Sequence, residues 1–120
     1  MIRRLAGLVV MPAVVVALVS GCGGDDDTPA TEGGVVIDVV IENGTVTPDN
    51  ERIEATVGET VTVRIDSDAD DELHVHAVPE HSFEIHPGKQ ETQFSVDVPG
   101  QVAVELHDTG KTVATLLVRP

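Results

Sequence analysis

Sulfur and aromatic side chains are scarce in this sequence. Its 120 residues include one cysteine, two methionines and two phenylalanines, with no tryptophan and no tyrosine. Cys22, Met1 and Met11 all lie near the N-terminus, so residues 23–120 contain no sulfur atom. A copper centre built on thiolate and thioether ligands therefore cannot form within this part of the chain. Phe83 and Phe94 are the only large aromatic residues, which predicts an aliphatic core.

Basic side chains are also few. Seven Lys and Arg residues stand against 21 Asp and Glu residues, giving a formal net charge of −14 at pH 7. Such a charge repels nucleic acid and anionic lipid headgroups, and it attracts cations. We therefore expect no nucleic-acid partner, and we expect most of the carboxylates to serve solubility.

The N-terminal segment has the three-part layout of a secretory signal peptide. Arg3 and Arg4 form a basic start, residues 5–19 are predominantly apolar, and two small residues follow. The apolar run is shorter than the about 20 residues that a membrane-spanning helix needs. The sequence from Val19 to Cys22 resembles the bacterial lipobox, in which the cysteine is lipidated, for example with palmitate, and becomes the new N-terminus. A plain signal peptide with an incidental cysteine and an uncleaved membrane anchor are the alternatives.

The sequence predicts three parts. Residues 1–21 are the signal peptide, residues 22–34 form an acidic tether rich in Gly, Asp, Thr and Pro that begins with lipidated Cys22, and residues 35–120 form one small domain. Cleavage would remove two positive charges and no acid, taking the formal charge from −14 to −16. We expect the protein on the extracytoplasmic face of the cell membrane, or on its periplasmic side if there are two membranes, with lipid contacted through Cys22.

The domain alternates apolar and polar residues and is rich in Val, Ile and Thr, which is typical of strands buried on one face. Turn-forming pairs such as Asn43-Gly44 and Pro99-Gly100 separate the runs. Seven or eight short strands of this kind predict an all-β, antiparallel sandwich with Greek-key connections. The expected strands are 35–41, 52–57, 60–66, 73–78, 82–85, 92–96, 101–106 and 112–118.

All five histidines lie in the second half of the chain. Alternation in the 73–78 strand places His74 and His76 on one face, roughly 6.6 Å apart along the strand, a spacing at which two imidazoles can share a metal ion. Glu105 and His107 form a similar pair in a later strand. If the two strands are neighbours, these four side chains converge on one site whose imidazoles and carboxylate suit Cu(II) or Zn.

An alternative reading needs no metal. Leu73 and Val75 would fill the core, while the histidines stand in water or pair with nearby acids. His81 and His86 are expected at turns, outside the site. The acidic residues before and within the histidine strand are expected to form a solvated loop that raises the local cation concentration: Asp66, Asp68, Asp70, Asp71 and Glu72.

Two motifs carry a family resemblance. Residues 71–76 read Asp-Glu-Leu-His-Val-His, and residues 105–107 read Glu-Leu-His. In this order, and at this distance from the closing strand, they resemble a bacterial cupredoxin-like family of exported or membrane-tethered domains, across residues 35–120. The resemblance implies a cupredoxin Greek-key sandwich in which the two motif strands are adjacent near one end of the barrel.

Two classes of function follow. The first is a lipoprotein that captures or buffers Cu(II) or Zn through His74, His76, His107 and Glu105, without needing the metal to fold and without blue-copper electron transfer. The second is a metal-free interaction or assembly module of the cell envelope. In either case an envelope metal-transport or assembly protein is the expected protein partner. Enzymatic activity is not expected, because no general acid or base stands out and the chain is too short for a substrate domain.

Overall fold

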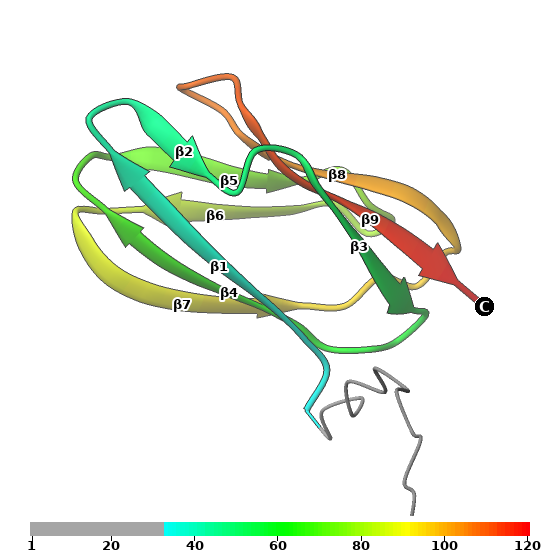
Figure 1. The fold of residues 1–120 in the computed structure, drawn as a ribbon. Coiled ribbons are helices and arrows are strands. Elements are labelled where there is room, and N and C mark those ends of the chain that lie inside the picture. The colour runs from blue at the N-terminus through cyan, green and yellow to red at the C-terminus, as the bar shows by residue number, and fades with distance from the viewer. Residues whose placement is uncertain (1–32) are drawn as a thin grey trace, which may run out of the picture.

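The computed structural model describes residues 33–120, which form nine β-strands in two sheets packed face to face (Figure 1). The predicted signal peptide, the lipidation site Cys22 and nearly all of the tether lie outside the described residues. Within residues 33–120, no helix is long and apolar enough to cross a membrane.

Each sheet draws strands from both halves of the domain. The four-stranded sheet has the order β2-β1-β4-β7 and consists of β1 (Val35–Glu42), β2 (Thr45–Thr47), β4 (Val61–Ser67) and β7 (Gly88–Phe94). The five-stranded sheet has the order β3-β9-β8-β5-β6 and consists of β3 (Glu51–Thr56), β5 (Asp71–Val75), β6 (His81–Ile85), β8 (Gly100–Leu106) and β9 (Thr112–Arg119).

The predicted β-sandwich is confirmed, with two differences in detail. All eight expected strands are present, and the short strand β2 is an addition, joined to β1 by a hairpin at Asn43-Gly44. Both turn residues have positive φ, 50° and 75°, as a type I′ turn requires. The sheets are mixed rather than purely antiparallel, because β1 pairs with β4 and β3 pairs with β9 in parallel. The chain changes sheets between these strands, so parallel neighbours are not consecutive in sequence.

The core between the sheets is aliphatic, as the composition predicts. Ile37 of β1 and Val63 of β4 face inward and are at most 2% exposed, and Leu73 and Val104 from the other sheet are fully buried. Phe94 is the one phenylalanine that is buried in this core, whereas Phe83 packs only partly against it.

The two ends of the sandwich differ in the segments that they hold (Figure 1). One end, here called the tether end, contains the start of β1 and the loops 57–60, 76–80 and 95–99. The opposite end, here called the acidic end, contains the loops 43–44, 68–70, 86–87 and 107–111. Strands β5 and β8 run between these ends and position the predicted site.

Candidate metal-binding site

The two motif strands are neighbours, as the convergence of their polar side chains requires. Strand β5 lies between β6 and β8 and is antiparallel to both. Leu73 is in register with Leu106, and His74 is in register with Glu105. Because Leu73 and Leu106 point into the core, His74 and Glu105 both lie on the outer face of the five-stranded sheet.

His74 of β5 and His76, the first residue after this strand, stand beside each other on this outer face. Their ring centroids are 4.5 Å apart and the ring planes are tilted by 55°. The Nε2 atom of His76 is 2.9 Å from Oε2 of Glu105, and the side chain of His76 is 45% exposed. The hydroxyl of Thr112 donates to the other oxygen of Glu105 at 3.5 Å. Glu105 is thus held between the imidazole and the next strand.

A second carboxylate, that of Glu80, contacts the other imidazole, His74. Its Oε1 atom contacts Nε2 of His74. Glu80 was not among the predicted site residues, because it lies in the loop between β5 and β6 and its place depends on the hairpin register. Val75 is paired with His81, so the loop returns directly over the outer face beside His74. The only signal in the sequence is an acid a few residues after the second histidine.

His107 directly follows β8, two residues beyond Glu105, and is displaced from this group toward the acidic end. Its backbone N–H donates to the carbonyl oxygen of Glu72 at 2.9 Å, so His107 is opposite Glu72 while Glu105 is opposite His74. Among residues 33–120, no group of three or more His, Cys, Asp or Glu side chains is arranged to hold a metal ion. The structure places His74, His76 and Glu105 beside one another, with His107 nearby, but it does not arrange any three of them as ligands of one ion.

These side chains are here called the His–Glu cluster (His74, His76, Glu80 and Glu105). Their donor atoms suit a metal ion of intermediate softness. Imidazole nitrogens and carboxylate oxygens suit Cu(II) and Zn, whereas the sulfur that Cu(I) prefers is lacking in residues 33–120. Both imidazoles contact carboxylates through Nε2, which leaves Nδ1 of each ring for another partner. A carboxylate on one ring nitrogen and a metal on the other is a frequent arrangement in metal sites, since the carboxylate fixes the orientation of the ring.

Asp71 differs from the expected solvated acidic loop. It belongs to β5, it is 7% exposed, and its carboxylate accepts backbone N–H groups from three residues. Oδ1 accepts from Glu72 at 2.7 Å and from Asp108 at 2.9 Å, and Oδ2 accepts from Thr109 at 3.4 Å. Asp71 therefore fixes the loop that follows His107. A buried acid looks the same as an exposed one in the sequence, because two of its three donors, Asp108 and Thr109, come from a segment far along the chain.

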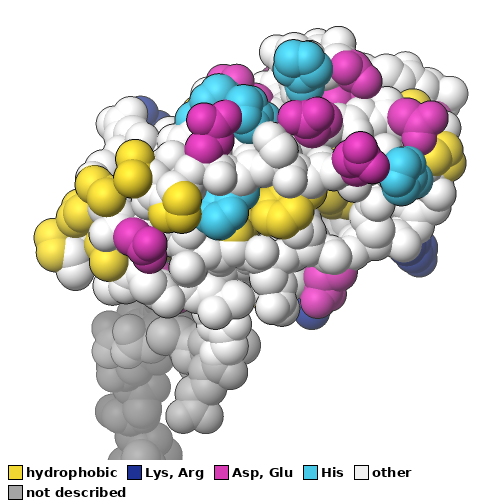
Figure 2. Space-filling view, turned by 180° about the vertical axis from the view of Figure 1, so that it is seen from behind, with side chains coloured by type: hydrophobic (Ala, Val, Ile, Leu, Met, Phe, Trp, Pro, Cys, Tyr) yellow, Lys and Arg dark blue, Asp and Glu magenta, His cyan; other side chains and the backbone are white. Residues whose placement is uncertain are grey.

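The remaining two histidines have separate surroundings. His81 belongs to β6, not to a turn, and its ring stacks on Phe83 at a centroid distance of 6.1 Å, with Nε2 3.3 Å from the Ser95 carbonyl oxygen. His86 is exposed at the acidic end, where Nδ1 is 3.2 Å from Asp70 and Nε2 is 3.7 Å from Glu84. Figure 2 shows histidine side chains lying among acidic ones on this side of the molecule. His81 is thus a packing residue, and His86 belongs to the acidic surface.

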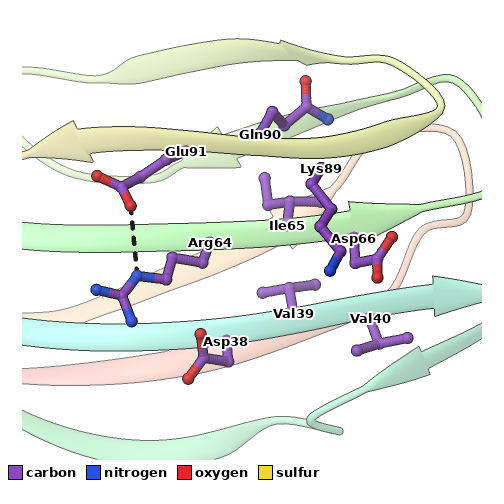
Figure 3. A pocket seen from close by; sticks show the side chains of 9 residues that line it. All are labelled: Asp38, Val39, Val40, Arg64, Ile65, Asp66, Lys89, Gln90 and Glu91. Atoms are coloured by element: carbon purple, nitrogen blue, oxygen red, sulfur yellow. Dashed lines mark hydrogen bonds and ion pairs between the residues drawn. The ribbon is translucent and has the colours of Figure 1, made fainter.

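The outer face of the other sheet carries a shallow depression of about 580 Å³ (Figure 3). Its charged side chains form rows across the strands, with Arg64 in register with both Asp38 and Glu91. Arg64 and Glu91 form an ion pair at 3.3 Å. Because Arg64 and Lys89 offset most of its acidic charge and its lining contains no histidine, this surface is a poorer candidate for metal binding than the His–Glu cluster.

Comparisons with known proteins identify the fold. No protein-family model and no curated protein matches the sequence. Among solved structures, the chain is similar to reduced auracyanin from the photosynthetic bacterium Roseiflexus castenholzii, with a TM-score of 0.53 and 13% identity over 73% of this chain and 99% of that one. It is also similar to a chain of a heme-copper terminal oxidase dimer, with a TM-score of 0.52 and 15% identity over 82% of this chain and 78% of that one. The reduced Cu(I) form of a mutant amicyanin at pH 4 matches with a TM-score of 0.50 and 16% identity, over 73% and 84% of the two chains. Auracyanin and amicyanin are cupredoxins, so the domain is a cupredoxin-like β-sandwich. At these identities the similarity establishes the fold alone.

Proposed function

We propose that this protein is a membrane-anchored extracytoplasmic lipoprotein whose cupredoxin-like domain binds Cu(II) or Zn to capture or buffer the ion. The observation that supports the proposal most strongly is the pair of neighbouring imidazoles of His74 and His76, whose ring centroids are 4.5 Å apart and which each contact a carboxylate. The proposed role is binding rather than catalysis, and the metal is not required for folding.

His74 and His76 are the proposed nitrogen ligands, and Glu105 is the proposed carboxylate ligand. Because Glu105 contacts Nε2 of His76 and the three side chains are not arranged around one point, binding requires a rearrangement of these side chains. Glu80 orients His74, and His107 is a third imidazole that a side-chain rearrangement would bring in. The surroundings favour cations, because the chain carries a net charge of −14 and acidic residues line this side of the domain. Several solved structures with this fold are copper proteins, such as the Cu(I) form of amicyanin. The sulfur-free donor set supports a site of a different kind from a blue-copper electron carrier.

The membrane anchor in this proposal is Cys22. It follows a basic and then apolar segment and ends a sequence that resembles a lipobox. Acyl chains contribute about 0.8 kcal/mol for each buried methylene, so two or more chains would hold the domain firmly at the membrane surface.

A calorimetric titration with Cu(II), and then with Zn, tests the metal proposal. The protein would be the signal-cleaved Cys22→Ala form, which avoids lipid, compared with the same form carrying His74→Ala and His76→Ala. We expect sub-micromolar binding at one ion per chain that the double substitution abolishes. His86→Ala is the matched control, because His86 also faces carboxylates but lies at the acidic end.

The alternative is a metal-free interaction or assembly module of the cell envelope. One observation favours it. Each imidazole of the His–Glu cluster already contacts a carboxylate, so these side chains have polar partners when no ion is bound. Absence of binding in the titration, or weak binding that survives the double substitution, would support this module and contradict metal capture.

A further inference from the structure

Exposed apolar side chains gather at the tether end of the domain. Val78 is 65% exposed and Val98 is 48% exposed, which are the two largest exposures among the big hydrophobic residues of the described part. Pro79 and Pro99 stand beside them and are exposed as well. In Figure 2, hydrophobic side chains are concentrated at the left end of the view, while most Asp, Glu and His side chains lie above it and toward the other end.

Three loops form this surface, and backbone hydrogen bonds hold them together. The N–H of Asp97 donates to the Val78 carbonyl oxygen at 3.4 Å, which joins the loop after β5 to the loop after β7. The N–H of Gly58 donates to the Val96 carbonyl oxygen at 3.0 Å, which joins the loop after β3. Backbone hydrogen bonds therefore join the loops that carry four exposed apolar residues, here called the apolar tip (Val78, Pro79, Val98 and Pro99). Val57 and Ala77 lie in the same loops but pack partly against the core, and the exposed acids Glu80 and Asp97 adjoin the tip in sequence.

The position of the N-terminal attachment suggests what covers the tip. Strand β1 begins at Val35, and the Val35 N–H donates to the Thr60 carbonyl oxygen at 3.0 Å, so the chain enters the domain at the same end as the tip. Even when fully extended, the segment from Cys22 to Val35 spans at most about 45 Å. A lipidated Cys22 would hold the apolar tip close to the bilayer at a high effective concentration, so that a weak apolar contact would suffice.

We propose that the apolar tip rests on the phospholipid surface in which Cys22 is anchored, with Val78 and Val98 at the boundary between headgroups and acyl chains. This orientation rests on the proposed lipid anchoring. It directs the acidic end, with Asp70, Glu84 and Asp108, into the aqueous phase, and it places the loop 76–80, which carries His76 and Glu80, on the membrane side of the domain. An apolar patch that would be a liability on a freely diffusing domain is then covered in the anchored protein.

Site-directed labelling of the acylated full chain in phosphatidylcholine vesicles tests the orientation. Because residues 23–120 contain no cysteine and acylation consumes the Cys22 thiol, a single introduced cysteine is labelled specifically. Val78→Cys reports on the tip. Val40→Cys is the matched control, since Val40 is also an exposed valine, at 43%, but lies on the outer face of the four-stranded sheet. Asp108→Cys reports on the acidic end.

The readout is quenching of a fluorescent label by a quencher attached to lipid, with flotation of the vesicles measured on the same samples. We expect quenching at position 78 several times stronger than at positions 40 and 108. Equal and weak quenching at all three positions in protein that floats with the vesicles would overturn the orientation alone, and would leave the tip free for a protein partner. Protein that fails to float would overturn the lipid anchoring and the orientation together.

Discussion

The buried carboxylate of Asp71 offers a direct test of how the domain holds the loop that follows His107. Replacing Asp71 with Ala removes two short hydrogen bonds, at 2.7 and 2.9 Å, and one long one, at 3.4 Å, all from backbone N–H groups. A hydrogen bond to a charged group contributes about 1.5–3 kcal/mol, and water can replace part of it in the exposed loop. We therefore expect a loss of about 3 kcal/mol of unfolding free energy, which is a large share of the 5–15 kcal/mol that is typical of a domain.

Urea unfolding of the soluble Cys22→Ala form measures this effect. With a slope of about 1.5 kcal/mol per molar urea, the midpoint should fall by about 2 M. Asp70→Ala is the matched control, because Asp70 is the adjacent acid, its side chain is 77% exposed, and its ion-pair partner within residues 33–120 is the exposed His86. Amide exchange at Asp108 and Thr109 should become faster in the Asp71 variant. A midpoint for Asp71→Ala equal to that for Asp70→Ala would refute the reasoning.

Three further substitutions have defined outcomes. Cys22→Ala should move the protein from the membrane fraction to the soluble fraction without changing its urea midpoint, and a variant that is cleaved yet stays membrane-bound would contradict lipidation. Gly44→Ala should destabilise the domain by about 1 kcal/mol, because Gly44 has a positive φ. Gly34→Ala should cost more, because Gly34 also has a positive φ and the new Cβ would lie 2.1 Å from the Thr60 carbonyl oxygen. Equal urea midpoints for the two variants would contradict this. Glu80→Gln should weaken Cu(II) binding about tenfold in calorimetry, as loss of an orienting carboxylate does in other metal sites, and unchanged affinity would remove Glu80 from the site.

The outer face of β5 illustrates which features of the site can be predicted from the sequence alone. Alternation predicts that Leu73 is buried while His74 and His76 share the opposite face, because side-chain direction in a strand has a fixed period of two. The same alternation places Glu105 and His107 on one face. The adjacency of the two strands came from the family resemblance, and the structure confirms it with His74 in register with Glu105.

Other features depend on contacts that a linear pattern does not encode. The parallel pairing of β1 with β4 depends on which sheet each strand joins, which alternation leaves open. Strand β2 is only three residues long, too short for a period to be recognised. The contact of Glu80 with His74 depends on hairpin register, and the burial of Asp71 depends on donors at Asp108 and Thr109.

Electron paramagnetic resonance of the domain loaded with one equivalent of Cu(II) tests the central claim most directly. Two imidazole ligands and carboxylate oxygens, without sulfur, predict an axial spectrum with wide copper hyperfine splitting and superhyperfine structure from nitrogen. The nitrogen structure should disappear in the His74→Ala, His76→Ala variant and persist in His86→Ala. A spectrum that shows no nitrogen coupling, or one that is unchanged by the double substitution, would contradict a metal site on the outer face of β5.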